Sequence, residues 1–204
     1  LCKDYRDLEG SFDKLVSIEM IEAVGHDWYA SYFRKCSELL KPEGLMVLQA
    51  ITMVDQRYER ARDSVDFIKR YVFPGGCLPS LEVIGRHIAR DTDLQTIGLH
   101  DITADYARTL ACWRERFLAA MPAVREQGFD TLFERLWEFY LCYCEGGFTE
   151  RVIGTVQITF AKPGYRRPPE SDHPRGRAQE DFLTASQADS AACLASSWTT
   201  MGSG

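Results

Sequence analysis

The sequence predicts an α/β fold, because short apolar runs of strand length alternate with longer segments of helical periodicity. The apolar runs lie at 14–18, 45–52, 94–102 and 155–161. The helical segments lie at 28–40, 80–90, 105–121 and 129–148. Strand, helix and strand in succession are typical of an open, largely parallel sheet, with long helices inserted before the last strands.

The first two strands and the helix between them carry clear boundary signals. Leu15–Ile18 is a continuous apolar run that suits a buried strand. Asp27 is expected to cap the helix that follows, and Pro42 with Gly44 is expected to end it. The next strand, 45–52, has the run MVLQAI at its centre.

The later helices are placed by a cap and by apolar spacing. Ser80 is expected to cap the helix at 80–90. The helix at 105–121 carries an apolar stripe at i, i+4, i+7 and i+11, which predicts a core-facing side. The residues of the stripe are Tyr106, Leu110, Trp113 and Phe117.

The segment 55–72 reads as a basic amphipathic helix. A solvated helix face is one interpretation, and a face attracted to an anionic membrane surface is the other. Its basic residues are Arg57, Arg60, Arg62, Lys69 and Arg70.

Composition narrows the classes of protein. With 204 residues and 45% hydrophobic content, the chain is long enough for one substantial domain. No apolar run reaches the roughly 18 to 20 residues of a membrane span, and no secretory leader is expected. The net charge of −6 argues against nucleic acid as a partner, because phosphate binding needs a basic surface. Seven cysteines without paired CxxC spacing indicate free thiols in a reducing cytoplasm, and no metal site.

The two ends of the chain differ from its middle. Residues 1–8 read as the end of a strand, without an initiating Met, and no glycine-rich strand-to-helix turn follows. The sequence is therefore expected to be a fragment whose folded domain spans 1–163. From Gly164 onward periodicity vanishes among Arg, Pro, Ser, Asp and Ala, which predicts a disordered tail over 164–204.

Three polar side chains beside the first two strands are candidate site residues. Glu19 and Glu22 follow the strand at 14–18, where ligands of open α/β sheets bind. Solvated loop carboxylates are the commoner interpretation of two such acids. Gln49 is the only amide inside the strand at 45–52, and burying it unsatisfied costs on the order of 1 to 3 kcal/mol. A structural hydrogen bond and a ligand contact both remain open for it.

Several stretches resemble the cyclopropane-fatty-acyl-phospholipid synthases and the related mycolic acid cyclopropane synthases, which are methyltransferases that use S-adenosylmethionine. The resemblance covers Asp4 to about Pro163. The similar stretches are SIEMIEAVG at 17–25, LKPEG at 40–44, LQAI at 48–51, FPGGCLPS at 73–80, HDITADY at 100–106 and YLCYCEGGF at 140–148.

The resemblance implies a fold and a cofactor. The fold is part of a class I, Rossmann-like methyltransferase sheet with inserted helices, of which the N-terminal half is missing. The cofactor is S-adenosylmethionine, with Asp4, Tyr5 and Arg6 at its border. Because the glycine-rich cofactor loop is missing, the chain alone is not expected to be active.

The resemblance also implies a reaction, in which the sulfonium methyl is added to a cis double bond of a phospholipid acyl chain. Bound bicarbonate is the base in that family, and here it would be held by Glu22, Gln49, the backbone of Ile51 and Tyr106. The catalytic residues would be Glu22, Tyr106 and Cys144, the last at the family's active-site cysteine position. Gln49 departs from the histidine of many members, and it can donate a hydrogen bond but cannot titrate.

The implied partners are unsaturated phospholipid acyl chains, with the protein cytoplasmic and peripheral to the inner face of the membrane. A homodimer remains open. Two alternatives stay beside this interpretation. In one, the same cofactor chemistry ends in a methyl-branched or methylene lipid; in the other, the chain is a non-catalytic module that binds lipid or protein.

Overall fold

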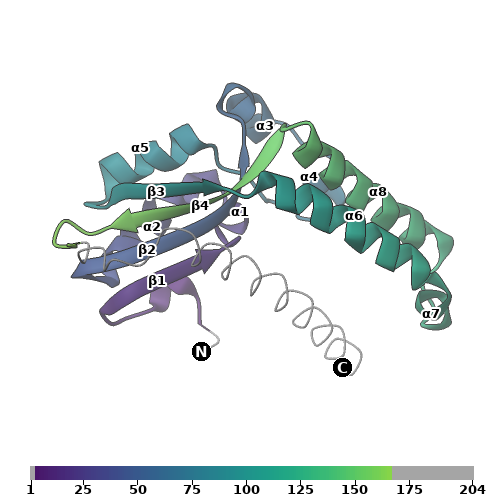
Figure 1. The fold of residues 1–204 in the computed structure, drawn as a ribbon, viewed down its shortest axis with the longest axis horizontal. Helices are drawn as coiled ribbons and strands as arrows, with labels where there is room; N and C mark the ends of the chain where they lie inside the picture. Colours follow the sequence, from purple (N-terminus) through teal and green to yellow (C-terminus); the bar gives the residue numbers. More distant parts are fainter. Residues whose placement is uncertain (1–2, 167–204) are drawn as a thin grey trace, which may run out of the picture. The chain divides into compact units, whose positions relative to one another are not determined.

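The computed structural model describes residues 3–166, and the tail predicted for 164–204 lies almost wholly outside this range. Four strands form one mixed sheet in the order β1-β2-β4-β3 (Figure 1). β1 and β2 are parallel, whereas β4 runs antiparallel to both β2 and β3. The four predicted strands are confirmed, with bounds β1 Phe12–Ile18, β2 Leu40–Met53, β3 Gln95–Asp101 and β4 Ile153–Ala161.

The two faces of the sheet differ in what covers them. On β2 the side chains of Met46, Leu48 and Ala50 are wholly buried, while those of the residues between them are only half-buried. The buried side packs against α2 (Tyr29–Glu38) and α5 (Leu81–Asp91). Burying large apolar side chains contributes about 1.5 to 3 kcal/mol each, so this face holds the fold together.

The helix at 80–90 begins as predicted, whereas the expected cap of the first long helix is wrong. Ser80 Oγ accepts from Val83 N at 3.3 Å and starts α5. α2 begins without a side-chain cap, because a short 3₁₀ turn, η2 (His26–Trp28), leads directly into it. Pro42 and Gly44 lie within β2, where β2 bulges between its pairs with Phe12 and Lys14.

Three helices follow β3 and lead to β4. α6 (Thr103–Ala119) and α8 (Thr131–Thr149) lie side by side, and the short α7 (Met121–Glu126) joins them (Figure 1). Their contact buries Leu110, Leu141 and Phe148. The predicted stripe on α6 is therefore partly core, although Trp113 is 39% exposed. None of the helices in the described part of the chain combines the length and apolarity of a membrane span.

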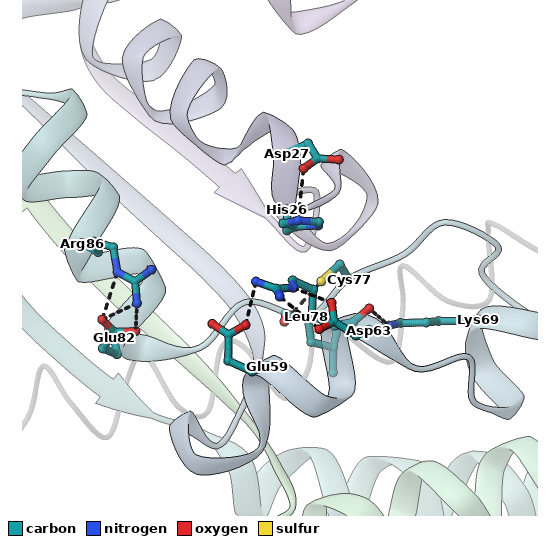
Figure 2. Close-up of polar contacts among 10 residues, drawn as sticks. His26, Asp27, Glu59, Asp63, Lys69, Cys77, Leu78, Glu82 and Arg86 are labelled. Atoms are coloured by element: carbon teal, nitrogen blue, oxygen red, sulfur yellow. Dashed lines mark hydrogen bonds and ion pairs between the residues drawn. The ribbon is translucent and has the colours of Figure 1, made fainter.

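The basic helix predicted for 55–72 is wrong. The segment forms η3 (Asp55–Arg57), α3 (Tyr58–Asp63) and α4 (Phe67–Tyr71), because Ser64 adopts an extended backbone that ends α3. Lys69 Nζ donates to the carbonyls of Ala61 at 2.5 Å and Ser64 at 2.9 Å, so its ammonium group caps α3. Figure 2 shows Asp63 of α3 next to Lys69 of α4. Lys69 and Arg62 therefore bind groups of the same segment, so these two positive charges are partly neutralised or capped within it.

The strand end predicted at 1–8 is also wrong in the part that the structure describes. Tyr5–Asp7 form a 3₁₀ turn, η1, because the Asp4 side chain accepts from Arg6 N and caps it. β1 is nevertheless an edge strand, as expected. Val16 and Ile18 are 65% and 63% exposed on the face of the sheet away from α2 and α5.

We predict that this exposed apolar pair makes the chain self-associate, because exposed edge strands and apolar faces pair with other chains. Val16→Thr with Ile18→Thr keeps the β-branched shape and should lower the apparent mass measured by light scattering. Val65→Thr is the matched control, since Val65 is 74% exposed but lies between α3 and α4. A monodisperse wild-type monomer would contradict the prediction.

Candidate functional site

The candidate site lies where β1 and β2 end. The two strands are parallel, so their carboxyl ends share one edge, and Ile18 of β1 pairs with Gln49 of β2. Glu19 follows β1 directly, and Glu22 lies on the single-turn helix α1 (Ile21–Val24). Tyr106 comes from the first turn of α6, which starts where Asp101 Oδ1 accepts from Thr103 N at 2.8 Å. Residues far apart in sequence therefore meet at this edge.

Glu22 is held by the backbone and has one free oxygen. Its Oε1 accepts from Ile51 N at 2.6 Å, and its own carbonyl accepts from Cys77 N at 2.8 Å. Burial raises the pKa of Glu22 to about 7. Its Oε2 is buried without a hydrogen-bond partner within the described residues. Such an oxygen is suited to contact a ligand or to carry the proton.

Gln49 is the centre of a polar network that joins β2, β4, α6 and the turn after β1. Its Nε2 donates to Tyr106 Oη at 2.7 Å and to Glu19 Oε1 at 2.9 Å. Its Oε1 accepts from Gln157 Nε2 on β4 at 2.8 Å. The Tyr106 hydroxyl donates to Glu19 Oε1. The structural hydrogen bond that was one interpretation of Gln49 is present, and it leads to the other candidate residues.

The residues predicted to hold bicarbonate are only partly connected by hydrogen bonds. Gln49 and Tyr106 are in direct contact, and Glu22 binds Ile51, two residues along β2 from Gln49. Within residues 3–166 no hydrogen bond joins Glu22 to Gln49 or Tyr106. The Ile51 N–H, expected to donate to an anion, donates to Glu22.

Two members of the network, Glu19 and Gln157, had no assigned role in the sequence prediction. The sequence places Glu19 after a strand, where ligands bind, but assigns it no partner, and it contains no signal for Gln157. Gln157 could have been found from the strand register, because it pairs directly with Gln49 in the sheet. That register is not visible in a single sequence.

Cys144 lies on α8 beside the same network. It packs with Tyr106 and Ile51 against the buried cluster of Leu110, Leu141 and Phe148. The rings of Tyr106 and Phe148 are 5.3 Å apart. Burial raises the pKa of Cys144 to about 11, so its thiol is protonated at neutral pH. Cys142 is exposed, and both cysteines are free thiols, as expected.

The three residues assigned to the cofactor form an exposed turn. Asp4 binds Arg6 through two bonds, at 2.9 and 2.7 Å, and this guanidinium holds the pKa of Asp4 down at about 2. Tyr5 packs edge-on against Tyr32 at 5.7 Å. The assignment of this turn to the cofactor stays a prediction. Across residues 3–166, no hydrogen bond connects this turn to the Gln49 network, and no group of three acidic, His or Cys residues could hold a metal ion.

Comparison with known proteins places the chain. Residues 1–158 match the sequence model of a family described as mycolic acid cyclopropane synthetase. The chain belongs to this family. The family match includes Glu19, Glu22, Gln49 and Tyr106, together with Gln157 at its end.

Relatives of the family share its sequence and its fold. The chain is 40% identical over 164 residues to tuberculostearic acid methyltransferase UfaA1 of Mycobacterium tuberculosis, covering 80% of this chain and 38% of the relative. It is 38% identical over 165 residues to the cyclopropane-fatty-acyl-phospholipid synthase of Escherichia coli, covering 79% and 41%. The chain thus spans about two-fifths of the length of these curated relatives.

Solved structures confirm the class I methyltransferase fold. The cyclopropane synthase MmaA2 of Mycobacterium tuberculosis superposes with a TM-score of 0.71 at 26% identity, covering 79% of this chain and 59% of that one. The mycolic acid cyclopropane synthase CmaA1, complexed with SAH and CTAB, gives the same TM-score and coverage at 25% identity. The described residues therefore form part of the sheet expected from the resemblance.

The buried Glu22 predicts a pH-dependent stability. Folded Glu22 keeps its proton up to about pH 7, whereas the unfolded group releases it near 4.5. The free energy of unfolding should thus fall as pH rises from 4.5 to 7, by on the order of 3 kcal/mol. Glu22→Gln mimics the neutral acid, so the melting temperature of this variant should rise relative to that of the wild type as the pH increases from 4.5 to 7. Glu38→Gln, at an exposed position of α2, is the control. A melting-temperature difference between Glu22→Gln and the wild type that stays constant with pH contradicts the assignment.

Proposed function

We propose that the protein transfers the methyl group of S-adenosylmethionine to a cis double bond in the acyl chain of a phospholipid. The observation that supports this most strongly is the contact between Gln49 and Tyr106 beside the buried Glu22, in a chain of this family. The buried carboxyl group of Glu22, with its free oxygen, can carry a proton, which a methyl transfer that ends in proton removal requires.

The residues around the network suit the chemistry of a cation. S-adenosylmethionine, when bound, supplies an electrophilic methyl group, and its addition to a double bond leaves positive charge on the acyl chain. The rings of Tyr106 and Phe148 offer faces that stabilise such charge. The cluster of Leu110, Leu141 and Phe148 packs against Tyr106 and supplies apolar surface there, and the reaction needs a site from which water that would quench the charge is excluded.

A proton must then be removed from the added carbon. Gln49 Nε2 and the Tyr106 hydroxyl are donors that can hold an oxyanion for this purpose. Bicarbonate remains the prediction that follows from the family resemblance. Glu22, protonated below about pH 7, can donate from its free Oε2 to the same region.

A membrane-facing acyl substrate is supported by exposed aromatic side chains. Phe139 and Tyr143 of α8 are 51% and 44% exposed, and Phe139 packs edge-on against Phe67 of α4 at 4.7 Å. Tyr71 and Phe73 extend this aromatic surface, at 58% and 57% exposure. Rings of this kind favour the interface of a bilayer, so we propose a peripheral position at the inner face of the cytoplasmic membrane.

Methyl transfer from labelled S-adenosylmethionine to vesicles tests the proposal, with the complete gene product that contains this sequence. Vesicles of cis-unsaturated phospholipid should become labelled, and vesicles of saturated phospholipid should not. Mass spectrometry of the released fatty acids distinguishes a ring from a methyl branch or a methylene group. A methyl branch is the second candidate, because one relative is named a tuberculostearic acid methyltransferase. The proposal is overturned if neither lipid becomes labelled, or if both become labelled equally.

Glu22→Gln separates a role in proton handling from a role in cofactor binding. The amide keeps the contact with Ile51 N but removes the titrating group. Product formation should fall by about 100-fold, the usual contribution of a proton-transfer group, while the Kd for S-adenosylmethionine stays within about threefold. Unchanged turnover would show that Glu22 does not take part in the reaction.

A further inference from the structure

Two of the three side chains expected to hold bicarbonate, Gln49 and Tyr106, already hold a carboxylate. Gln49 Nε2 donates to Glu19 Oε1 at 2.9 Å, and the Tyr106 hydroxyl donates to the same oxygen. Both bonds fall on Oε1, and within residues 3–166 no residue donates to Oε2. The third expected donor, Ile51 N, is taken by Glu22.

The position of Glu19 is set by the backbone as well as by its side chain. Its N–H donates to the carbonyl of Gln49 at 2.9 Å, which ties the turn after β1 to β2. Its φ of 50° lies in the left-handed region, where residues other than glycine are uncommon. Unfavourable backbone conformations of this kind persist when surrounding contacts enforce them, and they gather at functional sites.

The orientation of the Gln49 amide follows from the same contacts. A carboxylate can only accept hydrogen bonds, so the amide must present its NH₂ group to Glu19. Its carbonyl oxygen then faces β4 and accepts from Gln157 Nε2 at 2.8 Å. Gln157 is thus a positioning residue, because it holds the amide with its donors toward Glu19.

We propose that Glu19 is itself the base of the reaction, and that its carboxylate takes the place of bicarbonate in this protein. This inference rests on the proposed function. A carboxylate and bicarbonate are both planar oxyanions that the same two donors can bind. They cannot be bound together, because two anions at hydrogen-bond distance from one donor pair repel each other.

The raised pKa of the neighbouring acid Glu22 agrees with Glu19 acting as the base. Burial, and to a smaller extent the charge of Glu19, raises the pKa of Glu22 to about 7. This raised pKa favours the neutral form of Glu22, which is the form expected of an acid that acts beside a base.

The proton transfer balances without a further reactant. The alkene electron pair forms the bond to the methyl carbon as the sulfur–carbon bond breaks, leaving neutral thioether and a cationic acyl chain. Glu19 Oε2 then accepts a proton from the added methyl group. The electron pair of that C–H bond closes the cyclopropane ring, and Glu19 becomes a neutral acid that returns its proton to solvent.

Two substitutions at Glu19 test the proposal in the complete gene product. Glu19→Gly removes the carboxylate, accepts the positive φ and frees both donors for an anion. Glu19→Gln fills the same space with a group that is not basic. Glu9→Gly, at an exposed acid before β1, is the matched control. Melting temperatures establish that the variants fold.

The wild type should keep its methyl-transfer rate within about twofold when bicarbonate and dissolved CO₂ are removed. Both Glu19 variants should lose about 100-fold or more, the contribution of a general base. Added bicarbonate should restore Glu19→Gly toward the wild-type rate and leave Glu19→Gln inactive. A wild type that needs bicarbonate, or a Glu19→Gly variant that is active without it, overturns the proposal.

A second measurement does not depend on turnover. Labelled [¹³C]bicarbonate should broaden in the NMR spectrum with Glu19→Gly and remain sharp with the wild type and with Glu19→Gln. Broadening with the wild type shows that Glu19 does not occupy the anion's place. Absence of methyl transfer in every sample, with this binding pattern intact, would instead reject the proposed function and leave the occupancy by Glu19 standing.

Discussion

The alternation of side chains along β2 is the constraint on which the rest of the structure depends. Met46, Leu48 and Ala50 are wholly buried on one face, and Gln49 and Ile51 lie between and beyond them on the other. A slip of one residue would exchange the two sets and place the Gln49 amide in the apolar core. The burial that selects the register therefore also brings the polar groups of the site to the end of the strand.

The turn after β1 contains two features that lower the stability of the folded protein. Glu19 has a left-handed backbone, and three residues later Glu22 has a buried oxygen without a partner in the described chain. Each feature costs on the order of 1 to 3 kcal/mol. The core formed by α2 and α5 supplies the free energy that tolerates both, and such local violations are expected where a protein binds or reacts.

Some features specified by neighbouring residues could be predicted, although the Asp27 cap was not among them, and those specified by distant contacts could not. The strands and the Ser80 cap follow from patterns within a few residues, and both are present. The helix expected across 55–72 failed because Lys69 caps α3 from the next helix, a contact that helical periodicity does not show. The family resemblance brought Gln49 and Tyr106 together correctly. It did not reveal that Glu19 would accept hydrogen bonds from both, since that depends on the backbone of one turn.

The place of β4 in the sheet has a consequence for synthesis of the protein. β4 is the last strand within residues 3–166, yet it lies between β2 and β3 and supplies the described pairing of β3. On the ribosome, where chains grow at about 5 to 20 residues per second, β2 presents an open edge until β4 emerges. α6 and α8 can pair earlier, because they are separated only by α7 and its flanking turns. A chaperone that binds open strand edges would thus have its opportunity between the synthesis of β2 and that of β4.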